Sequence, residues 1–175
     1  MLEILILSLL VLLFAWVPTF FSSKLAGNPK MLWMVKIIIF GTYIYANLIE
    51  TLLFREVHFV RTAKPVPLWS YREALHLIGG FGITDHPLLY QIILNIILYI
   101  PMGYLLPFVW KKLQSPTWVS WPVVCIGMLC SVLTECTQFV FRIGLFELDD
   151  IMNNTLGCFI GYMLYSFIQK YRREA

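Results

Sequence analysis

The sequence predicts an all-α integral membrane protein, a bundle of five transmembrane helices with a short extracytoplasmic helical segment. Hydrophobic residues make up 59% of the 175-residue chain and charged residues 13%, whereas soluble domains average about 45–50% and about 25%. The mean hydropathy is +0.77, and the apolar residues fall in runs long enough to cross a bilayer, which takes about 20 residues. We therefore expect one compact helical domain over residues 1–175.

Each predicted transmembrane helix is one of these apolar runs. The runs cover Leu2–Phe21, Met31–Phe54, Leu88–Trp110, Trp118–Phe141 and Ile151–Ile168. The first run lacks a preceding basic segment and a clear cleavage site, so we expect a retained helix there and not a secretory signal. The four cysteines have no C-x-x-C spacing and the three histidines are scattered. The sequence therefore predicts no metal site and no cofactor.

The positions of lysine and arginine predict the orientation. Five crossings place eight of the 13 basic residues on the side of the C-terminal tail, and nine of the ten acidic residues on the other side. Cytoplasmic loops carry the excess of basic residues in membrane proteins. We therefore expect a multi-pass protein of the cell membrane with its N-terminus outside and its C-terminus in the cytoplasm.

The long loop between the second and third runs lies outside in this topology. Residues 70–73 match the capping-box pattern Ser-x-x-Glu, and Gly79–Gly80 would stop the helix that follows. This short helix would either lie on the outer membrane surface or cover the end of the bundle. Its apolar residues are Trp69, Tyr71, Leu75 and Ile78.

Polar residues gather at the predicted outer ends of four transmembrane helices. An ionisable side chain in the hydrocarbon layer costs about 2.5–3.5 kcal/mol even on lenient insertion scales, so several at one depth indicate a function. The residues at this level are Asn47, Glu50, Gln91, Asn95, Glu135, Gln138, Asp149, Asp150, Asn153 and Asn154. We predict a polar site that opens to the outside.

Helical spacing groups these residues further. Glu135, Gln138 and Arg142 are three and seven residues apart, so a continuous helix would place them on one face. Asp149 or Asp150 would cap the fifth helix, where the helix dipole favours a carboxylate. The candidate ligand-binding residues are Glu50, Asn95, Glu135, Gln138, Arg142, Asp149, Asp150 and Asn154, and the candidate helix-packing residues are Pro101, Gly103, Gly157 and Gly161.

Two interpretations of the polar group stay open. A net negative cleft favours a cationic ligand or a shared proton, and Arg142 could instead bind a carboxylate or phosphate. Alternatively, the residues form a network that only holds the bundle together, with Glu135 paired to Arg142 and Asn95 bonded to Asn154. No H-E-x-x-H, G-x-S-x-G or Walker motif is present. If the protein is an enzyme, Glu135 and Asp150 are the expected acid and base.

Two motifs resemble those of the VanZ-like family of membrane proteins. Residues 95–103 (NIILYIPMG) look like its N-x5-P-x-G motif. Residues 135–161 resemble the second motif, E-x2-Q followed by D-D-x3-N-T-x-G-x3-G. Arg142 and Glu147 match positions where many relatives carry arginine and aspartate. The resemblance covers about Pro67–Gly161, and an asparagine that often precedes the third helix in the family is missing here.

The family is named for a teicoplanin-resistance determinant of Gram-positive bacteria, so the resemblance implies a cell-envelope role and glycopeptide tolerance. The first hypothesis is a non-enzymatic protein that binds an envelope lipid, a lipid-linked precursor or a glycopeptide antibiotic, or alters access to it. The second is an enzyme that modifies a lipid-linked envelope substrate, and the third is a small cation- or proton-coupled transporter. We expect membrane lipid and no nucleic acid as partners, and the sequence leaves the oligomeric state open.

Overall fold

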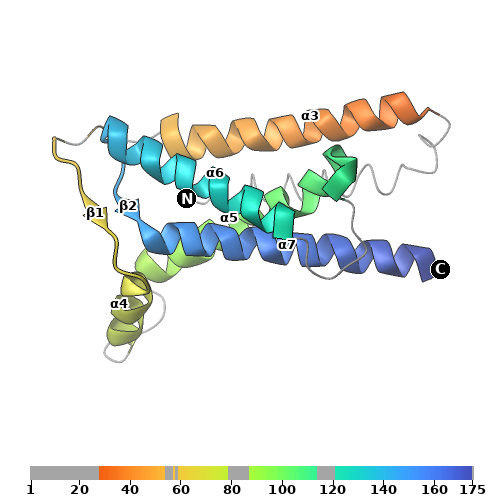
Figure 1. The fold of residues 1–175 in the computed structure, drawn as a ribbon. Coiled ribbons are helices and arrows are strands. Elements are labelled where there is room, and N and C mark those ends of the chain that lie inside the picture. Colours follow the sequence, from red (N-terminus) through yellow and green to blue (C-terminus); the bar gives the residue numbers. More distant parts are fainter. Residues whose placement is uncertain (1–27, 54–56, 58, 79–86, 114–120, 175) are drawn as a thin grey trace.

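The computed structural model describes residues 28–53, 57, 59–78, 87–113 and 121–174, and the predicted helix Leu2–Phe21 lies outside them. Long helices dominate this part of the chain (Figure 1). They are α3 (Pro29–Leu48), α5 (Pro87–Val109), α6 (Trp121–Phe141) and α7 (Leu148–Glu174). The shorter elements are the π-helical turn η1 (Ile49–Leu53), β1 (Ala63–Lys64), α4 (Trp69–Ile78), the 3-10 turn η3 (Lys111–Leu113) and β2 (Phe146–Glu147). Strands β1 and β2 pair in parallel, with Ala63 opposite Phe146.

Within the described residues, three helices are long and apolar enough to cross a membrane. They cover Pro29–Leu52, Pro87–Val109 and Trp121–Phe141. The structure is therefore that of an all-α membrane protein. The predicted fifth crossing, Ile151–Ile168, falls inside the 27-residue helix α7, which is not one of these three helices, so the five-span bundle stays a prediction.

Helices α5 and α7 pack backbone to backbone in the middle of the bundle. A Cβ atom added to Gly157 would lie 2.1 Å from the carbonyl oxygen of Ile96, and one added to Gly161 would lie 1.9 Å from that of Ile100. From the other helix, a Cβ on Gly103 would lie 1.8 Å from the carbonyl oxygen of Cys158. Only glycine permits such an approach. The two glycines of α7 thus pack within the chain, in a glycine seam formed by Gly103, Gly157 and Gly161.

The order of these contacts shows how the helices run. Gly157 lies against Ile96 and Gly161 against Ile100, so residue numbers rise in the same direction along α5 and α7. The two helices are therefore parallel. Helix α6 is antiparallel to both, since Cys158 lies against Val123 and Asn154 bonds to Ser131 further along α6. Consequently the C-terminal ends of α3 and α6 meet the N-terminal ends of α5 and α7 at one end of the bundle (Figure 1).

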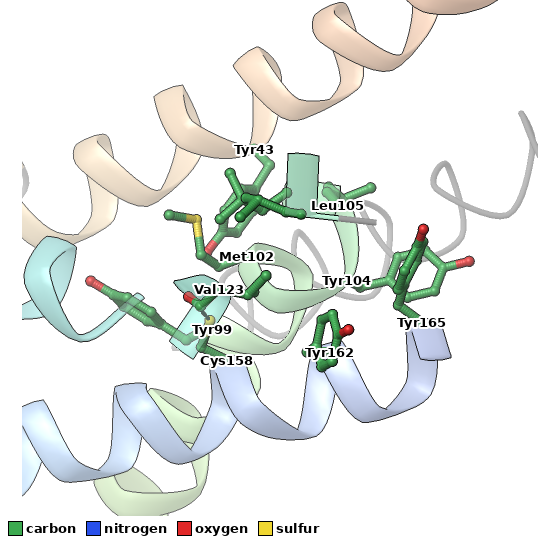
Figure 2. Packing of buried hydrophobic residues seen from close by; sticks show 11 residues of the cluster. Tyr43, Tyr99, Met102, Tyr104, Leu105, Val123, Cys158, Tyr162 and Tyr165 are labelled. Atoms are coloured by element: carbon green, nitrogen blue, oxygen red, sulfur yellow. Dashed lines mark hydrogen bonds between the residues drawn. The ribbon is translucent and has the colours of Figure 1, made fainter. Parts of the chain in front are cut away.

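An aromatic cluster fills the bundle beside this seam (Figure 2). Tyr99, Tyr104, Tyr162 and Tyr165 are buried there, with Tyr43 reaching in from α3. The hydroxyl of Tyr43 donates to the carbonyl oxygen of Leu98 at 3.0 Å. This bond falls in the turn of α5 where Pro101 interrupts the backbone hydrogen bonds of the helix.

Candidate functional site: the polar end of the bundle

The end of the bundle where α6 finishes and α5 and α7 begin carries most of the buried polar side chains. We call it the polar end. The buried members that are polar or charged are Asn47, Thr51, Ser70, Ser131, Thr134, Glu135, Gln138, Glu147, Asp149, Asn153 and Asn154. They come from α3, η1, α4, α6, β2 and α7.

Glu135 is only 2% exposed and faces the loop between α6 and α7. Its Oε2 atom accepts a hydrogen bond from the backbone N–H of Glu147 at 2.9 Å. This bond joins the last turns of α6 to β2, immediately before α7 begins. A buried carboxylate that accepts a backbone N–H forms a strong, charge-assisted bond, so Glu135 holds the loop in place.

Gln138 connects α6 to the π-helical turn at the end of α3. Its Nε2 atom donates to the carbonyl oxygen of Thr51 at 2.9 Å. Thr51 in turn donates through its hydroxyl to the carbonyl oxygen of Asn47 at 2.7 Å. A π-helical turn interrupts the regular hydrogen-bond pattern of a helix, and Gln138 supplies a partner to one of its carbonyl groups.

Asp149 has no solvent-exposed surface and caps a helix other than its own. Its carboxylate accepts hydrogen bonds from the backbone N–H groups of Leu68 (2.5 Å) and Ser70 (2.8 Å) and from the hydroxyl of Ser70 (2.5 Å). The first turn of α4 thereby receives a negative charge where the helix dipole favours one. Leu68, just before α4, has a positive φ of 61°.

Two predictions about caps are therefore wrong. Ser70 is not the N-cap of a self-contained capping box, because α4 begins at Trp69 and the capping carboxylate comes from Asp149 of α7. Helix α7 begins at Leu148, so both aspartates lie inside its first turn. The carboxylate of Asp149 is directed to α4 instead of the free N–H groups of its own helix.

Helix α4 is attached to the bundle at further points. The Tyr71 hydroxyl donates to Oδ1 of Asn153. The ammonium group of Lys64 lies 3.4 Å from the centre of the Trp69 ring, a cation–π contact that joins β1 to α4. Burial, and then the charge of Asp149, raises the pKa of Tyr71. Helix α4 therefore covers the start of α7. This agrees with one of its two predicted positions, at the end of the bundle.

Glu147 and Asp150 form a carboxyl pair beside α5. Both carboxyl groups lie beside the same side-chain amide, that of Gln91. Gln91 donates to Oε2 of Glu147 at 2.7 Å and points toward Oδ1 of Asp150 at 3.4 Å. The pair is thus joined to α5 through Gln91.

The pKa of Glu147 is raised above its usual value of 4.5. Burial is the main cause, and the charge of Asp149 adds to it. The hydrogen bond from Gln91, the nearby Lys64 and the bond with Asp150 act in the opposite direction. Because burial is the largest of these effects, the fold favours the neutral form of this carboxyl.

Three asparagines, one in α5 and two in α7, each have a side-chain polar atom without a hydrogen-bond partner among the described residues. They are Nδ2 of Asn95, Nδ2 of Asn153 and Oδ1 of Asn154. The expected bond between Asn95 and Asn154 is thus not formed, and Nδ2 of Asn154 donates instead to the Ser131 hydroxyl at 2.8 Å. An unsatisfied buried polar group costs about 1–3 kcal/mol, so a partner for these atoms would stabilise the polar end.

Arg142 and Glu50 are at the edge of this network. Helix α6 ends at Phe141, and Arg142 follows in the left-handed conformation (φ 61°) with its side chain exposed. The N–H of Ile143 donates to the carbonyl oxygen of Gln138 (3.0 Å), a C-terminal cap of the Schellman type. The prediction that Arg142 shares a face with Glu135 is therefore wrong, because it assumed a continuous helix. Glu50 is half-buried in η1, immediately before Thr51, whose carbonyl oxygen accepts from Gln138.

Some members of the polar end were not among the predicted site residues. Ser131 could have been identified as a small polar residue within an apolar run, but nothing local in the sequence indicates the contacts of Ser70 or Tyr71. Their partners lie 79 and 82 residues away. Within the described part of the chain, no group of three or more His, Cys, Asp or Glu side chains is arranged to hold a metal ion.

Apolar helices joined at one end by a buried polar network define a helical membrane protein. The family model VanZ/LLP1 matches residues 4–169, and the chain belongs to this family. Protein VanZ of Enterococcus faecium is 31% identical over 84 residues, which are 48% of this chain and 49% of that protein. The chain thus matches about half the length of this curated relative. No solved structure matches the chain.

Proposed function

We propose that this protein binds an envelope lipid, a lipid-linked precursor or a glycopeptide antibiotic at the polar end, or alters access to it, and that it thereby contributes to teicoplanin tolerance. The observation that carries this proposal is the set of buried groups without partners, on Asn95, Asn153 and Asn154, at the end of the bundle that also holds the carboxyl pair Glu147 and Asp150. Membership of the VanZ/LLP1 family supports the envelope role.

The orientation is part of the proposal. The polar end faces outside, where glycopeptides meet their targets, the N-terminus lies outside and the C-terminus lies in the cytoplasm. The parallel packing of α5 and α7 supports a membrane crossing by α7 alongside α5. Fusions of a periplasm- or exterior-active reporter after Lys112 and after the last residue test this: both fusions should be inactive, and an active one would reverse the orientation.

The ligand chemistry follows from the free atoms. Two unpartnered amide donors, on Asn95 and Asn153, and one acceptor, on Asn154, suit a ligand that carries both carbonyl and N–H or hydroxyl groups. Peptide and sugar portions of envelope precursors, and glycopeptides themselves, have these groups. Arg142, exposed at the end of α6, is available for an anionic group of the same ligand.

The test is susceptibility to teicoplanin in a susceptible Gram-positive host that expresses the protein, together with the lipid-precursor profile by mass spectrometry. Asn154→Ala and Asp150→Asn should each abolish the gain in tolerance while the protein is still present in the membrane. Glu73→Gln, at an exposed position of α4, is the matched control and should behave as the wild type. Unchanged tolerance in both site variants contradicts the proposal.

A second function is favoured by the carboxyl pair and the raised pKa of Glu147. Glu147 and Asp150 could act as acid and base on a lipid-linked substrate, since a carboxyl with a raised pKa can donate a proton and a neighbouring carboxylate can accept one. Glu135, the acid expected from sequence, is engaged with the backbone of Glu147. An enzyme would change the precursor profile, and the change would be lost in Glu147→Gln and in Asp150→Asn. Binding would change susceptibility and leave the precursors unaltered.

A further inference from the structure

The chain that leads from the end of η1 into α4 exposes several large apolar side chains. We call the described residues from 57 to 75, except 58, the peripheral segment. Phe59 is 98% exposed and Leu75 67%. The exposed large apolar residues of the segment are Val57, Phe59, Val60, Val66, Leu68 and Leu75. Apolar surface concentrated in one region of a protein marks a contact with another molecule or with a membrane.

The direction of the segment relative to the bundle indicates which contact this is. Strand β1 and helix α4 run across the ends of the long helices and not along them (Figure 1). A segment so placed lies parallel to the membrane surface when the long helices cross the membrane. Helix α4 buries Ser70 and Ala74 against the bundle and leaves Arg72 and Leu75 exposed. One side of α4 is thus fixed to the protein and the other is available.

Charge identifies the partner. Arg61, Lys64 and Arg72 are exposed alongside the apolar residues, and Glu73 is the exposed acid among the described residues of the segment. A surface that combines apolar side chains with a net positive charge is complementary to anionic phospholipid. The apolar side chains can insert among the acyl chains, and the positive charge is attracted to the phosphates. A second copy of this chain would instead meet the same positive charge.

We propose that the peripheral segment lies in the headgroup layer of the membrane and binds anionic phospholipid, with Phe59 and Leu75 inserted and Arg61 and Arg72 at the phosphates. This contact fixes α4 at the membrane surface. Through Asp149 and Asn153 it also fixes the start of α7, which α4 covers. The inference concerns a surface separate from the ligand contacts of the polar end and does not depend on which ligand binds there.

The test uses the full chain with nitroxide spin labels at Phe59→Cys and Leu75→Cys. The matched control is a label at Glu73→Cys, which is also exposed on α4 but on a different face from Leu75. Cys125, Cys130 and Cys136 are replaced, and the buried Cys158 is retained. The protein is reconstituted in vesicles of phosphatidylcholine alone or of equal parts phosphatidylcholine and phosphatidylglycerol. Relaxation by oxygen, which concentrates in lipid, is compared with relaxation by a water-soluble nickel complex.

Labels at 59 and 75 should be relaxed by oxygen and shielded from nickel, whereas the label at 73 should be accessible to nickel. Phosphatidylglycerol should increase the shielding, and Arg61→Gln with Arg72→Gln should remove that increase. Nickel access at 59 and 75 equal to that at 73 overturns the proposal. Shielding from both reagents also overturns it, because it indicates a protein contact, and a lipid effect that survives loss of both arginines overturns the role given to them.

Discussion

Helices α5 and α7 are joined in two different ways along their length. In the glycine seam their backbones touch, because Gly103, Gly157 and Gly161 leave no side chain between them. At the polar end the same helices are joined by side chains, through the bonds of Gln91 with Glu147 and Asp150. The seam therefore depends on the size of its residues, whereas the polar end depends on charge and protonation. Side chains at the polar end can therefore change without loosening the seam.

The largest effect should follow from adding one carbon atom to the seam. In Gly161→Ala the new Cβ would lie 1.9 Å from the carbonyl oxygen of Ile100, so the helices must separate, at a cost of about 3 kcal/mol or more. Thermal unfolding in detergent should show a large loss of stability. Gly41→Ala is the matched control, since nothing lies within 4 Å of its added Cβ. Equal stability of the two variants would mean that α5 and α7 are not in backbone contact.

The next effect tests the polar end. Asp149→Ala removes a carboxylate that accepts three hydrogen bonds from Leu68 and Ser70, which we expect to cost about 2–3 kcal/mol. Hydrogen exchange should become faster in α4 and stay unchanged in the glycine seam. Glu73→Ala, in the same helix but exposed, should leave both regions unchanged. Faster exchange across the whole chain would show that the two regions are not independent.

Protonation should affect the polar end alone. The folded state raises the pKa of Glu147 above 4.5, so it binds the proton more tightly than the unfolded chain does. The contribution of this carboxyl to stability is therefore greatest at acid pH and falls as the pH rises from 4.5 through the folded-state pKa. Glu147→Gln mimics the neutral acid and should lose this fall. The difference between the melting temperatures of variant and wild type, measured across this range, should grow with pH; a constant difference would contradict the raised pKa.

A smaller effect separates the backbone role of Arg142 from its charge. Its left-handed conformation (φ 61°) costs an L-residue about 1–2 kcal/mol and suits glycine, although glycine loses more chain entropy on folding. Arg142→Gly should therefore raise stability by about 0.5–1 kcal/mol in thermal unfolding. Arg142→Ala, which keeps the strain, should show no gain. Loss of tolerance in both variants would assign a function to the guanidinium group, and retained tolerance would remove Arg142 from the ligand site.

The smallest effect concerns a single hydrogen bond between α6 and α7. Ser131→Ala removes the partner of Nδ2 of Asn154, and such bonds between membrane helices average about 0.6 kcal/mol. Chemical denaturation in detergent should detect this loss. Thr42→Ala, whose exposed hydroxyl bonds only within its own helix, should change stability less. A loss from Ser131→Ala as large as that from Asp149→Ala would mean that this asparagine contributes to a wider network.

The gathering of polar residues at one end of the helices was predictable, whereas their partners were not. Glu135, Gln91 and Asp150 were expected at one level from hydropathy and topology, and the structure brings these helix ends together. The sequence did not predict that α6 ends before Arg142, which therefore does not share a helix face with Glu135. Periodicity describes residues inside a helix and does not say where the helix ends. The hydrogen bond suggested between Asn95 and Asn154 is absent for a related reason. Depth alone does not determine how far each helix rotates about its axis.

The sequence by itself determined the class of protein, three of its apolar helices and the helix ends at which polar groups gather, because each of these depends on local composition. Only the tertiary structure decided that Asp149 caps α4, that Glu135 holds the backbone of β2, and that Gln91 joins Glu147 and Asp150 to α5. Asp149 and Ser70 are 79 residues apart. Their bond depends on how α4, α5 and α7 are packed and rotated, and directional hydrogen bonds form only after the non-directional burial of apolar surface has placed those helices.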